Sequence, residues 1–463
     1  MQMNWRLITL INAGIALITV VAVIFDVTHK PGRQSHNQRP QNKAQSKSGD
    51  SLVDDQAARS RIESLTDLSN ARVDDLGAVP AAELTQLMSH ATPEQLAAMA
   101  YKFNEAPTDA RTLGGMAVFF QAWSELDPKA ALIGAFGLND IAFRKLAVGT
   151  VVNSVSPSAA PELIAHLTQH PDKDLLDECK NRFLNPLIAN WSTLDPEAAA
   201  QFMDELGDAK SDLNYTARNS IAYNWGSLDP NAALEWVEKQ KDKDFFNRTS
   251  VYDEIIRGWC LKDIASASAY VREHLDDPAA ETAASSVAEY LFDRNAEDAT
   301  GWIGRLPDGK ARNDAKSTIA TMWAEKDPAA AAKWVGTLSD SDKENVVGII
   351  ARSWVEKNWP EASRWIDSLN GAARDDALVA AVNRDGATEI ESLSLALSIK
   401  NPERQSNNIE NVIRNWSYND PEAAKTWVKN SPLSSEAREE LMMLISVAQK
   451  NAEEATAERV ITN

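Results

Sequence analysis

The residues best suited to metal chemistry are Glu162, His166 and His170, which follow one another at intervals of four. On an α-helix this spacing places all three side chains on one face, where carboxylate and imidazole groups could bind zinc. Pro171 follows His170 directly, so His170 is expected at the end of its helix. No further strong ligand lies nearby in the sequence, and we expect no metal site.

Carboxylates are abundant, and acid–base catalysis is the chemistry that they could support. Glu63-Ser64 and Glu391-Ser392 carry the Glu-Ser pair of lytic transglycosylases, but neither has the Gly- and Gln-bearing context that such enzymes show downstream. The chain also lacks a phosphate-binding loop, a Gly-rich dinucleotide turn, a nucleophile elbow and a Cys-x-x-Cys pair. The sequence therefore predicts that the protein is not an enzyme, has no catalytic residues and binds no small-molecule cofactor.

The two cysteines, Cys179 and Cys260, fall in repeat units two apart. Stacked helix layers pack at about 8–10 Å, whereas a disulfide needs Cα atoms within about 7 Å. We therefore expect both thiols to stay free and buried.

The chain has 14 tryptophans, and aromatic faces of this kind stack on sugars and choline groups. Twelve of the thirteen that follow Trp5, however, recur at two fixed positions of a repeat. This regularity favours a role in the core of the repeat. Trp359 is the exception, and we expect it to be exposed and to be the tryptophan best placed for a contact role.

The repeat is defined by blocks in which Trp is followed at +4 and +5 by Asp-Pro, as in Trp225-Gly-Ser-Leu-Asp229-Pro230. Ala follows at +7 and +8, and a second aromatic residue follows at +11. Degenerate copies start at Val155, Trp259, Leu291 and Trp354, with a weak copy near Val382. Successive units are roughly 31–36 residues long, and clear copies begin at Trp123, Trp191, Trp225, Trp323 and Trp416.

Each offset has a physical reason. Asp caps the first free amide groups of a helix, and Pro is tolerated at the first helical position because its missing N–H had no partner there. Proline also disfavours helix at the residue before it, so the preceding helix must end. The small Ala pair allows a neighbouring helix to approach, and the +11 aromatic returns close to the same face. Each unit is thus a longer helix, a corner, a shorter helix and a loop.

Because neither helix of a unit can bury its apolar stripe alone, successive units must stack. We predict an all-α fold: a right-handed α-solenoid of about ten helix–turn–helix repeats over residues 110–445. Residues 51–109 are expected to form a helical N-terminal cap or divergent repeats, and residues 446–463 a polar C-terminal tail.

This pattern resembles tetratricopeptide-type repeats in length, in helix–turn–helix plan and in its Trp, Ala and Pro positions. It is also similar to Trp/Asp-Pro/Ala-Ala/Trp repeats of uncharacterised bacterial proteins. It lacks the Leu-Gly and Tyr that follow the first Trp of the tetratricopeptide consensus, so the repeat is TPR-like. The resemblance implies a protein–protein scaffold with a concave face, which is an analogy of fold.

The N-terminus predicts a membrane anchor. Residues 7–25 form an apolar run long enough to span a bilayer as a helix, and no small-x-small cleavage site follows. We assign residues 1–27 to an uncleaved transmembrane anchor. Residues 28–50 are polar, with five Lys or Arg residues before Asp50, and we expect a basic disordered linker.

The formal charge of −20 argues against nucleic acid as a partner, because binding a polyanion requires neutralising phosphates. Acidity of this size otherwise keeps a long array soluble. A protein partner is expected instead, together with a membrane contact through residues 7–25.

The location favoured by the sequence is the bacterial inner membrane, with a single pass and a periplasmic body. The positive-inside rule would place Lys30, Arg33 and Arg39 in the cytoplasm. A short N-terminal flank is nevertheless typical of anchors whose long C-terminal portion is exported. We therefore expect export.

The function that fits these features best is a membrane-anchored scaffold or adaptor. Two alternatives stay open: an envelope glycan-binding or glycan-processing protein, and a structural spacer or self-associating array. The footprint of a partner is expected where the repeat pattern breaks, at the Val155 and Leu291 units, at Trp359 and near Val382.

Overall fold

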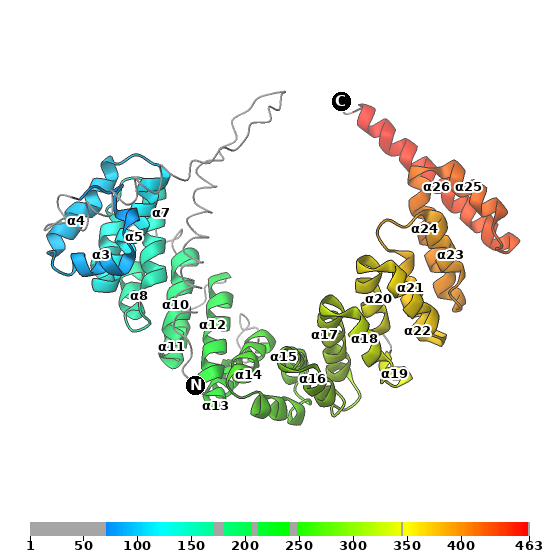
Figure 1. Cartoon of the computed structure of the whole chain (residues 1–463), viewed down its shortest axis with the longest axis horizontal. Helices are drawn as coiled ribbons and strands as arrows, with labels where there is room; N and C mark the ends of the chain where they lie inside the picture. The colour runs from blue at the N-terminus through cyan, green and yellow to red at the C-terminus, as the bar shows by residue number, and fades with distance from the viewer. Residues whose placement is uncertain (1–70, 170–179, 206–211, 241–247, 344–345, 462–463) are drawn as a thin grey trace. The chain divides into compact units, whose positions relative to one another are not determined.

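The computed structural model of the chain describes residues 71–169, 180–205, 212–240, 248–343 and 346–461 (Figure 1). Every regular element in these ranges is helical, which confirms the all-α fold class. The chain divides into two compact units, one that ends at Lys262 (unit 1) and one that begins at Asp263 (unit 2). The predicted anchor and linker, residues 1–50, lie outside the described residues.

Helices begin and end at the predicted corners. At the first corner the N–H of Asp127 donates to the carbonyl of Trp123 at 2.9 Å, which closes the longer helix. Asp127 then leaves the helical region, with φ −148° and ψ 90°, and its carboxylate accepts the N–H of Ala130 at 2.9 Å. Pro128 opens the next helix. The same arrangement recurs at Asp195, Asp229, Asp327 and Asp420.

The corner also forms where proline is missing. Asp263 has φ −148° and ψ 84° inside the helix α14, and its carboxylate accepts the N–H of Ser266 at 3.1 Å. Asn295 takes the same capping role at a corner without proline, and Asn358 does so where the proline, Pro360, stands one position later. The cap and the extended backbone of the corner residue therefore define this turn, and the proline reinforces it.

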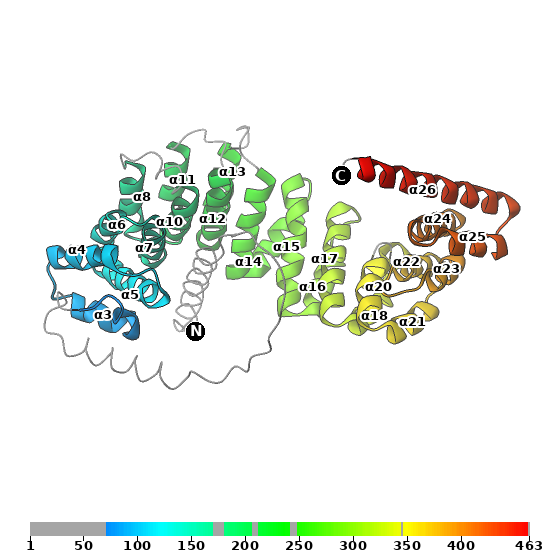
Figure 2. The ribbon, with the colours of Figure 1, turned by 90° about the horizontal axis from the view of Figure 1, so that it is seen from above.

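In unit 1 a longer and a shorter helix flank the corners at Asp127 and Asp229 (Figure 2). The longer helix packs against its shorter partner, as α5 does against α6 and α12 against α13, while α5 also packs on α7 and α10 on α12. The helices are α3 (Ala81–Met88), α4 (Pro93–Lys102), α5 (Ala110–Leu126), α6 (Pro128–Phe136), α7 (Ile141–Ser154), α8 (Ala160–Thr168), α10 (Asn185–Ser192), α11 (Pro196–Glu205), α12 (Asp212–Leu228), α13 (Pro230–Gln240) and the first part of α14 (Arg248–Glu273). Short 3-10 turns cover Leu76–Ala78 and Phe103–Glu105, and a π-turn covers Lys180–Leu184.

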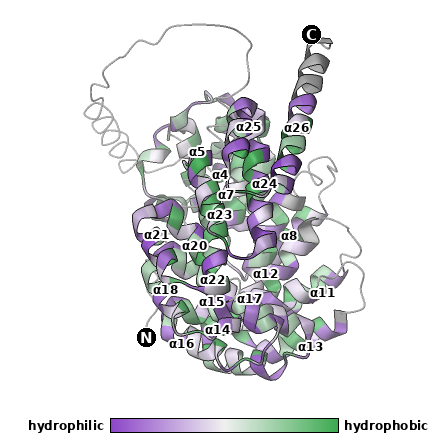
Figure 3. Ribbon diagram, turned by 90° about the vertical axis from the view of Figure 1, so that its right-hand side faces the viewer, coloured by the Kyte–Doolittle hydropathy of each residue, from purple (hydrophilic) through white to green (hydrophobic). Residues whose placement is uncertain are grey.

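Unit 2 is built in the same way from the end of α14 onward. The helix α15 packs on α17, α17 on α20, and α20 on α22, while each shorter helix packs on its own neighbours. Hydrophobic and hydrophilic residues alternate along these helices, as stacking of amphipathic helices requires (Figure 3). The helices are α15 (Pro278–Arg294), α16 (Ala296–Ile303), α17 (Lys310–Lys326), α18 (Pro328–Val335), α19 (Asp340–Lys343), α20 (Val346–Lys357), α21 (Trp359–Ser368), α22 (Gly371–Val382), α23 (Glu389–Leu397), α24 (Pro402–Asn419), α25 (Pro421–Asn430) and α26 (Ser435–Ile461).

The two aromatic positions of one unit meet in space, as the +11 offset predicts. The rings of Trp225 and Trp236 lie 5.6 Å apart between centroids, and those of Trp323 and Trp334 lie 5.7 Å apart. Pairs of this geometry contribute about 0.5–1.5 kcal/mol beyond the burial of their area. The same contact joins Trp354 to Trp365 and Trp191 to Phe202. No tryptophan of the described ranges is exposed, and those at the repeat positions are buried or half-buried against helix neighbours, as expected of core residues.

The Ala pair is split between two environments. The +8 residue is fully buried at the clear corners, as Ala131, Ala199 and Ala233 show, while the +7 residue remains partly exposed. The +8 methyl group is therefore the one that allows close helix packing.

Neighbouring repeats within each compact unit are also joined by hydrogen bonds between residues about one repeat length apart. The amide of Asn224 donates to Ser192 Oγ at 2.8 Å, and that of Asn190 donates to the carbonyl of Val155 at 2.7 Å. In unit 2, Ser353 donates to the carbonyl of Ala324 at 3.0 Å. These bonds satisfy polar groups at the helix ends and fix the register between neighbouring repeats.

The flanking segments continue the helical pattern. Residues 71–109 form α3, α4 and short turns, and α3 packs on α5 while α4 packs on α6. Residues 446–461 extend α26, in which Ala448 is buried. Within the described ranges no helix is both long and apolar enough to cross a bilayer.

Candidate binding groove

A groove of about 540 Å³ lies in unit 2 between α24, α26 and the turn that joins α25 to α26. Its position is set by two caps. Asn401 accepts the N–H of Arg404 at 3.0 Å and starts α24, with Pro402 at the first position. Ser434 accepts the N–H of Ala437 at 3.2 Å at the start of α26. The rim of the groove is therefore built from the first turns of two helices.

Apolar side chains form part of the groove's lining, although polar atoms make up the larger share of its exposed surface. Ile409 of α24 and Leu441 of α26 line the groove and are almost fully buried, since these residues hold the two helices together. Leu433, Ala437 and Leu444 also line it and stay partly exposed. An apolar group that enters the groove would cover these three side chains and gain about 25 cal/mol for each Å² of apolar surface removed from water.

The rim of the groove is acidic. Glu410 of α24 and Glu440 of α26 line it, and no Lys or Arg is among its lining residues. Glu410 accepts a hydrogen bond from Ser406 at 3.2 Å. In the described part of the chain neither carboxylate forms an ion pair. Apolar side chains beside two carboxylates suit the binding of an apolar side chain that is flanked by a cation.

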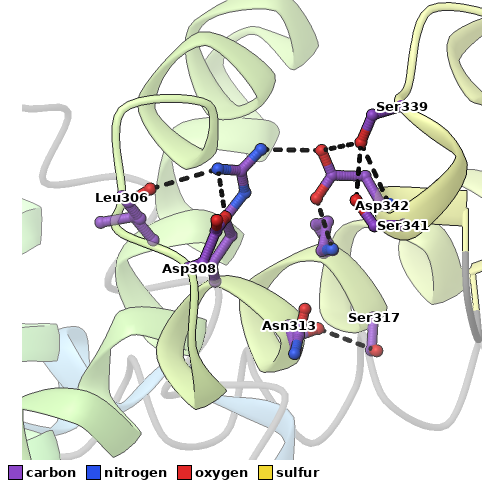
Figure 4. Close-up of polar contacts among 9 residues, drawn as sticks. Leu306, Asp308, Asn313, Ser317, Ser339, Ser341 and Asp342 are labelled. Atoms are coloured by element: carbon purple, nitrogen blue, oxygen red, sulfur yellow. Dashed lines mark hydrogen bonds and ion pairs between the residues drawn. The ribbon is translucent and has the colours of Figure 1, made fainter.

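A second polar cluster, in the same unit, is already saturated by its own residues. Asp342 accepts from Arg312 Nη2, Lys316 Nζ and Ser339 Oγ, each at 2.8 Å. Figure 4 shows Asp342 next to Ser339, with Leu306 and Asp308 on the far side of the cluster. Lys316 is only 3% exposed. Because α18 lies between α17 and the segment 339–342 in the chain, this cluster ties the loop after α18 back to α17.

Hydrogen bonds and charges set the acidity of Asp342. Partial burial alone would raise the pKa of this carboxyl group. Hydrogen bonds from Lys316 and Ser339 and the charges of Lys316 and Arg312 outweigh burial and hold the pKa below its ordinary value. Asp342 is therefore ionised at neutral pH and serves as a structural charge.

The metal candidates are only partly placed by the structure. Glu162 of α8 forms an ion pair with Lys129 of α6 at 3.0 Å, and His166 lies on α8. His170 lies outside the described residues. Among the described residues no group of three or more His, Cys, Asp or Glu could hold a metal ion.

Of the two Glu-Ser pairs, only Glu391-Ser392 lies among the described residues. Glu63-Ser64 lies outside the described residues. Glu391 forms a capping box with Thr388, which starts α23, and pairs with Arg384 at 3.1 Å. The backbone N–H of Thr388 is the main reason that the pKa of Glu391 is lowered. Ser392 is buried and donates to the carbonyl of Val382 at 2.7 Å. This pair therefore has a structural role.

Two further candidates are resolved by burial. Cys260 is buried and free, as expected, and burial raises the pKa of its thiol to about 12, so the thiol is inert at neutral pH. Cys179 lies outside the described residues.

Trp359 is half-buried, contrary to the expectation of exposure, because the guanidinium of Arg384 covers its ring at 4.1 Å. A residue 25 positions later in the chain thus closes this face of the tryptophan.

The groove was not among the expected sites. The expectation was that a partner would bind at breaks in the repeat, whereas the groove is lined by residues on both sides of the last clear copy, at Trp416. Pro432-Leu433, an apolar pair in a turn before a helix cap, is the signal that could have indicated it. Comparison with protein-family models, curated proteins and solved structures finds no match to this chain.

Proposed function

We propose that the protein is a membrane-anchored scaffold that holds a protein partner in the groove between α24 and α26. The observation that carries the proposal is the groove itself, with partly exposed Leu433 and Leu444 under an acidic rim. Protein-binding sites combine an apolar centre with a polar rim in this way.

The proposed architecture is a right-handed TPR-like α-solenoid. Two features support it: the recurrence of the Trp/Asp corner in both units, and the packing of each longer helix on the next within a unit. Stacked helical units of this kind expose long surfaces, which suit the binding of another polypeptide.

In this proposal, residues 7–25 anchor the chain in the bacterial inner membrane. The linker 28–50 then connects the anchor to a body in the periplasm. The support for this is the apolar run and the polar, basic segment that follows it.

The proposal is tested by affinity purification of the full-length chain from membranes of its host. Wild type is compared with Ala437→Trp, which fills the groove, and with Ala373→Trp, at a half-buried alanine of α22 that does not line it. We expect one stoichiometric protein partner with wild type and Ala373→Trp, and its loss with Ala437→Trp. Absence of a stoichiometric partner, or its retention by Ala437→Trp, would sink the proposal.

The glycan-processing alternative draws on one observation, which is that carboxylates from two separate helices, Glu410 and Glu440, line the same groove. The lining residues include no aromatic side chain on which a sugar ring could stack. Turnover of isolated peptidoglycan by wild type, abolished in Glu440→Gln, would favour this alternative over the scaffold. A spacer or self-associating array would instead give a monodisperse oligomer with no other partner.

A further inference from the structure

Three glycines in the described part of the chain have a positive φ, and each directly follows an aspartate or an asparagine. The pairs are Asp308-Gly309, Asn370-Gly371 and Asp385-Gly386. Glycine adopts this conformation at little cost because it has no Cβ atom. Only the middle pair carries a side-chain amide, and it is the one Asn-Gly pair of the whole sequence.

Asn370 stands directly before α22 but does not cap that helix. Its side chain accepts no hydrogen bond from the first turn of α22. Asn295, Asn358 and Asn401 stand at the same position of other helices in unit 2 and do accept one. A side chain caps when the residue after it is already helical, and Gly371, with φ +56°, is not. The amide of Asn370 is therefore exposed and has no capping role.

The backbone nitrogen of Gly371 is also accessible. Because Gly371 is the first residue of α22, its N–H has no acceptor within its own helix. The residue is exposed, and a Cβ atom added to it would meet nothing within 4 Å. This turn thus has room to rotate. Rotation brings the nitrogen of Gly371 onto Cγ of Asn370, with which it closes a five-membered ring.

We propose that Asn370-Gly371 is a site of spontaneous deamidation, with water as the second reactant. The nitrogen of Gly371 gives its proton to hydroxide and attacks Cγ of Asn370. The new N–Cγ bond forms, the Cγ–Nδ2 bond breaks, and the side-chain nitrogen takes up protons from water and leaves as ammonium. Water then opens the cyclic imide at either of its carbonyl carbons and gives aspartate or isoaspartate. One water is consumed and one ammonium ion is released, and no oxidant or reductant takes part.

Both products change the start of α22. Each adds a carboxylate at the N-terminus of the helix, where the helix dipole favours a negative charge. Isoaspartate also adds one methylene group to the main chain at this point. Because α22 packs on α20 and α23, isoaspartate displaces the start of a helix that both neighbours contact. The proposal does not depend on the groove, whose lining residues include neither Asn370 nor Gly371.

Comparable sites of unit 2 each lack one part of this chemistry. Asn401 is another exposed cap, but Pro402 follows it and has no N–H from which the attacking nitrogen could form. Asp308 and Asp385 precede glycines, but a carboxylate is a poorer electrophile than an amide. Asp308 is also held by Arg312, whose Nη1 donates to it at 3.1 Å.

The test is to incubate the folded full-length chain in detergent at 37 °C, at pH 7 and at pH 9. Peptide mapping by mass spectrometry measures acid at position 370, and methyl transfer by an isoaspartyl methyltransferase measures isoaspartate. Asn370→Gln is the test variant, because the longer side chain does not close a five-membered ring. Asn401→Gln is the matched control at an exposed cap of the same unit. A sample unfolded in urea shows what the reaction does without the fold.

We expect acid at position 370 to accumulate in the folded chain, faster at pH 9 than at pH 7 because hydroxide generates the attacking nitrogen. Position 401 should stay an amide. Isoaspartate should fall at least tenfold in Asn370→Gln and stay within about twofold of wild type in Asn401→Gln. If the folded chain keeps its amide at position 370 while the unfolded chain loses it, the fold protects this turn and the proposal is overturned. Equal isoaspartate in wild type and Asn370→Gln would overturn it as well.

Discussion

At the scale of single residues, Asp342 holds two cations of α17 with one carboxylate. Lys316 is buried and Arg312 is largely so, and both donate to Asp342. Removing one partner of a buried ion pair leaves an uncompensated charge, which costs far more than the loss of an exposed pair.

We therefore predict that Asp342→Asn lowers the free energy of unfolding at pH 7 by about 3 kcal/mol. Because folding lowers the pKa of Asp342, its contribution is present above the pKa of the unfolded chain, about 3.9, and is lost as the pH falls through the folded value. Urea midpoints of wild type and variant should thus converge below about pH 4. Asp340→Asn, at a fully exposed carboxylate, is the control and should change nothing. A difference that persists undiminished at acidic pH would contradict this account.

The corner aspartates give a second prediction at this scale. Replacing Asp327 with alanine removes the acceptor of the Ala330 N–H and should cost about 1 kcal/mol. Asp327→Asn should be nearly neutral, because Asn295 and Asn358 already cap equivalent corners. Thermal melts of the two variants test this. Equal loss in both would mean that charge, rather than capping, is what the corner needs.

The corners were predictable from the sequence because capping and the effect of proline are local. The cover of the Trp359 ring by Arg384 was not predictable, since Arg384 comes from a later turn and no local pattern marks that contact. The same holds for the partners of Asp342, which lie 26 and 30 residues earlier.

At the scale of elements, α12 and α14 approach closely at their corner ends. A Cβ atom added to Gly226 would stand 2.2 Å from the carbonyl oxygen of Ile255, and one added to Gly258 would stand 2.0 Å from that of Tyr223. Backbone atoms of this kind cannot move aside as a flexible side chain can. The two glycines thus set how closely these helices pack.

We predict that Gly226→Ala and Gly258→Ala each destabilise the fold by about 1–3 kcal/mol, through overpacking. Gly114→Ala is the matched control on α5, where an added Cβ would meet nothing within 4 Å. It should stabilise the protein by about 0.5–1 kcal/mol, because alanine loses less entropy in a helix. Chemical denaturation of the three variants decides this. If all three shifted in the same direction, close approach would not be the cause.

The groove belongs to this scale, and the sequence did not reveal it. Its walls are amphipathic helices whose apolar faces were expected to be fully used in stacking. Leu433, Ala437 and Leu444 stay partly exposed because they line the groove beside the contact of α24 with α26, and which apolar residues a helix contact leaves open depends on packing rather than on periodicity.

At the scale of the whole molecule, the account requires the N-terminus to hold the body at a membrane. Residues 7–25 should span the bilayer and export the rest of the chain. An alkaline phosphatase fusion placed after residue 50 should therefore be active in a bacterial host. A green fluorescent protein fusion at the same site should be dark, because export by the general secretory route prevents its fluorescence. The reverse pattern would place the body in the cytoplasm.

The most direct test of the central claim is site-specific photo-crosslinking from the groove in the full-length chain in its host. A benzophenone side chain in place of Leu433, which lines the groove, is compared with one in place of Ile390, which is exposed and does not line it. The account predicts one discrete protein adduct from position 433, absent from position 390 and lost when Ala437→Trp fills the groove. No protein adduct from position 433, or the same adduct from both positions, would contradict it.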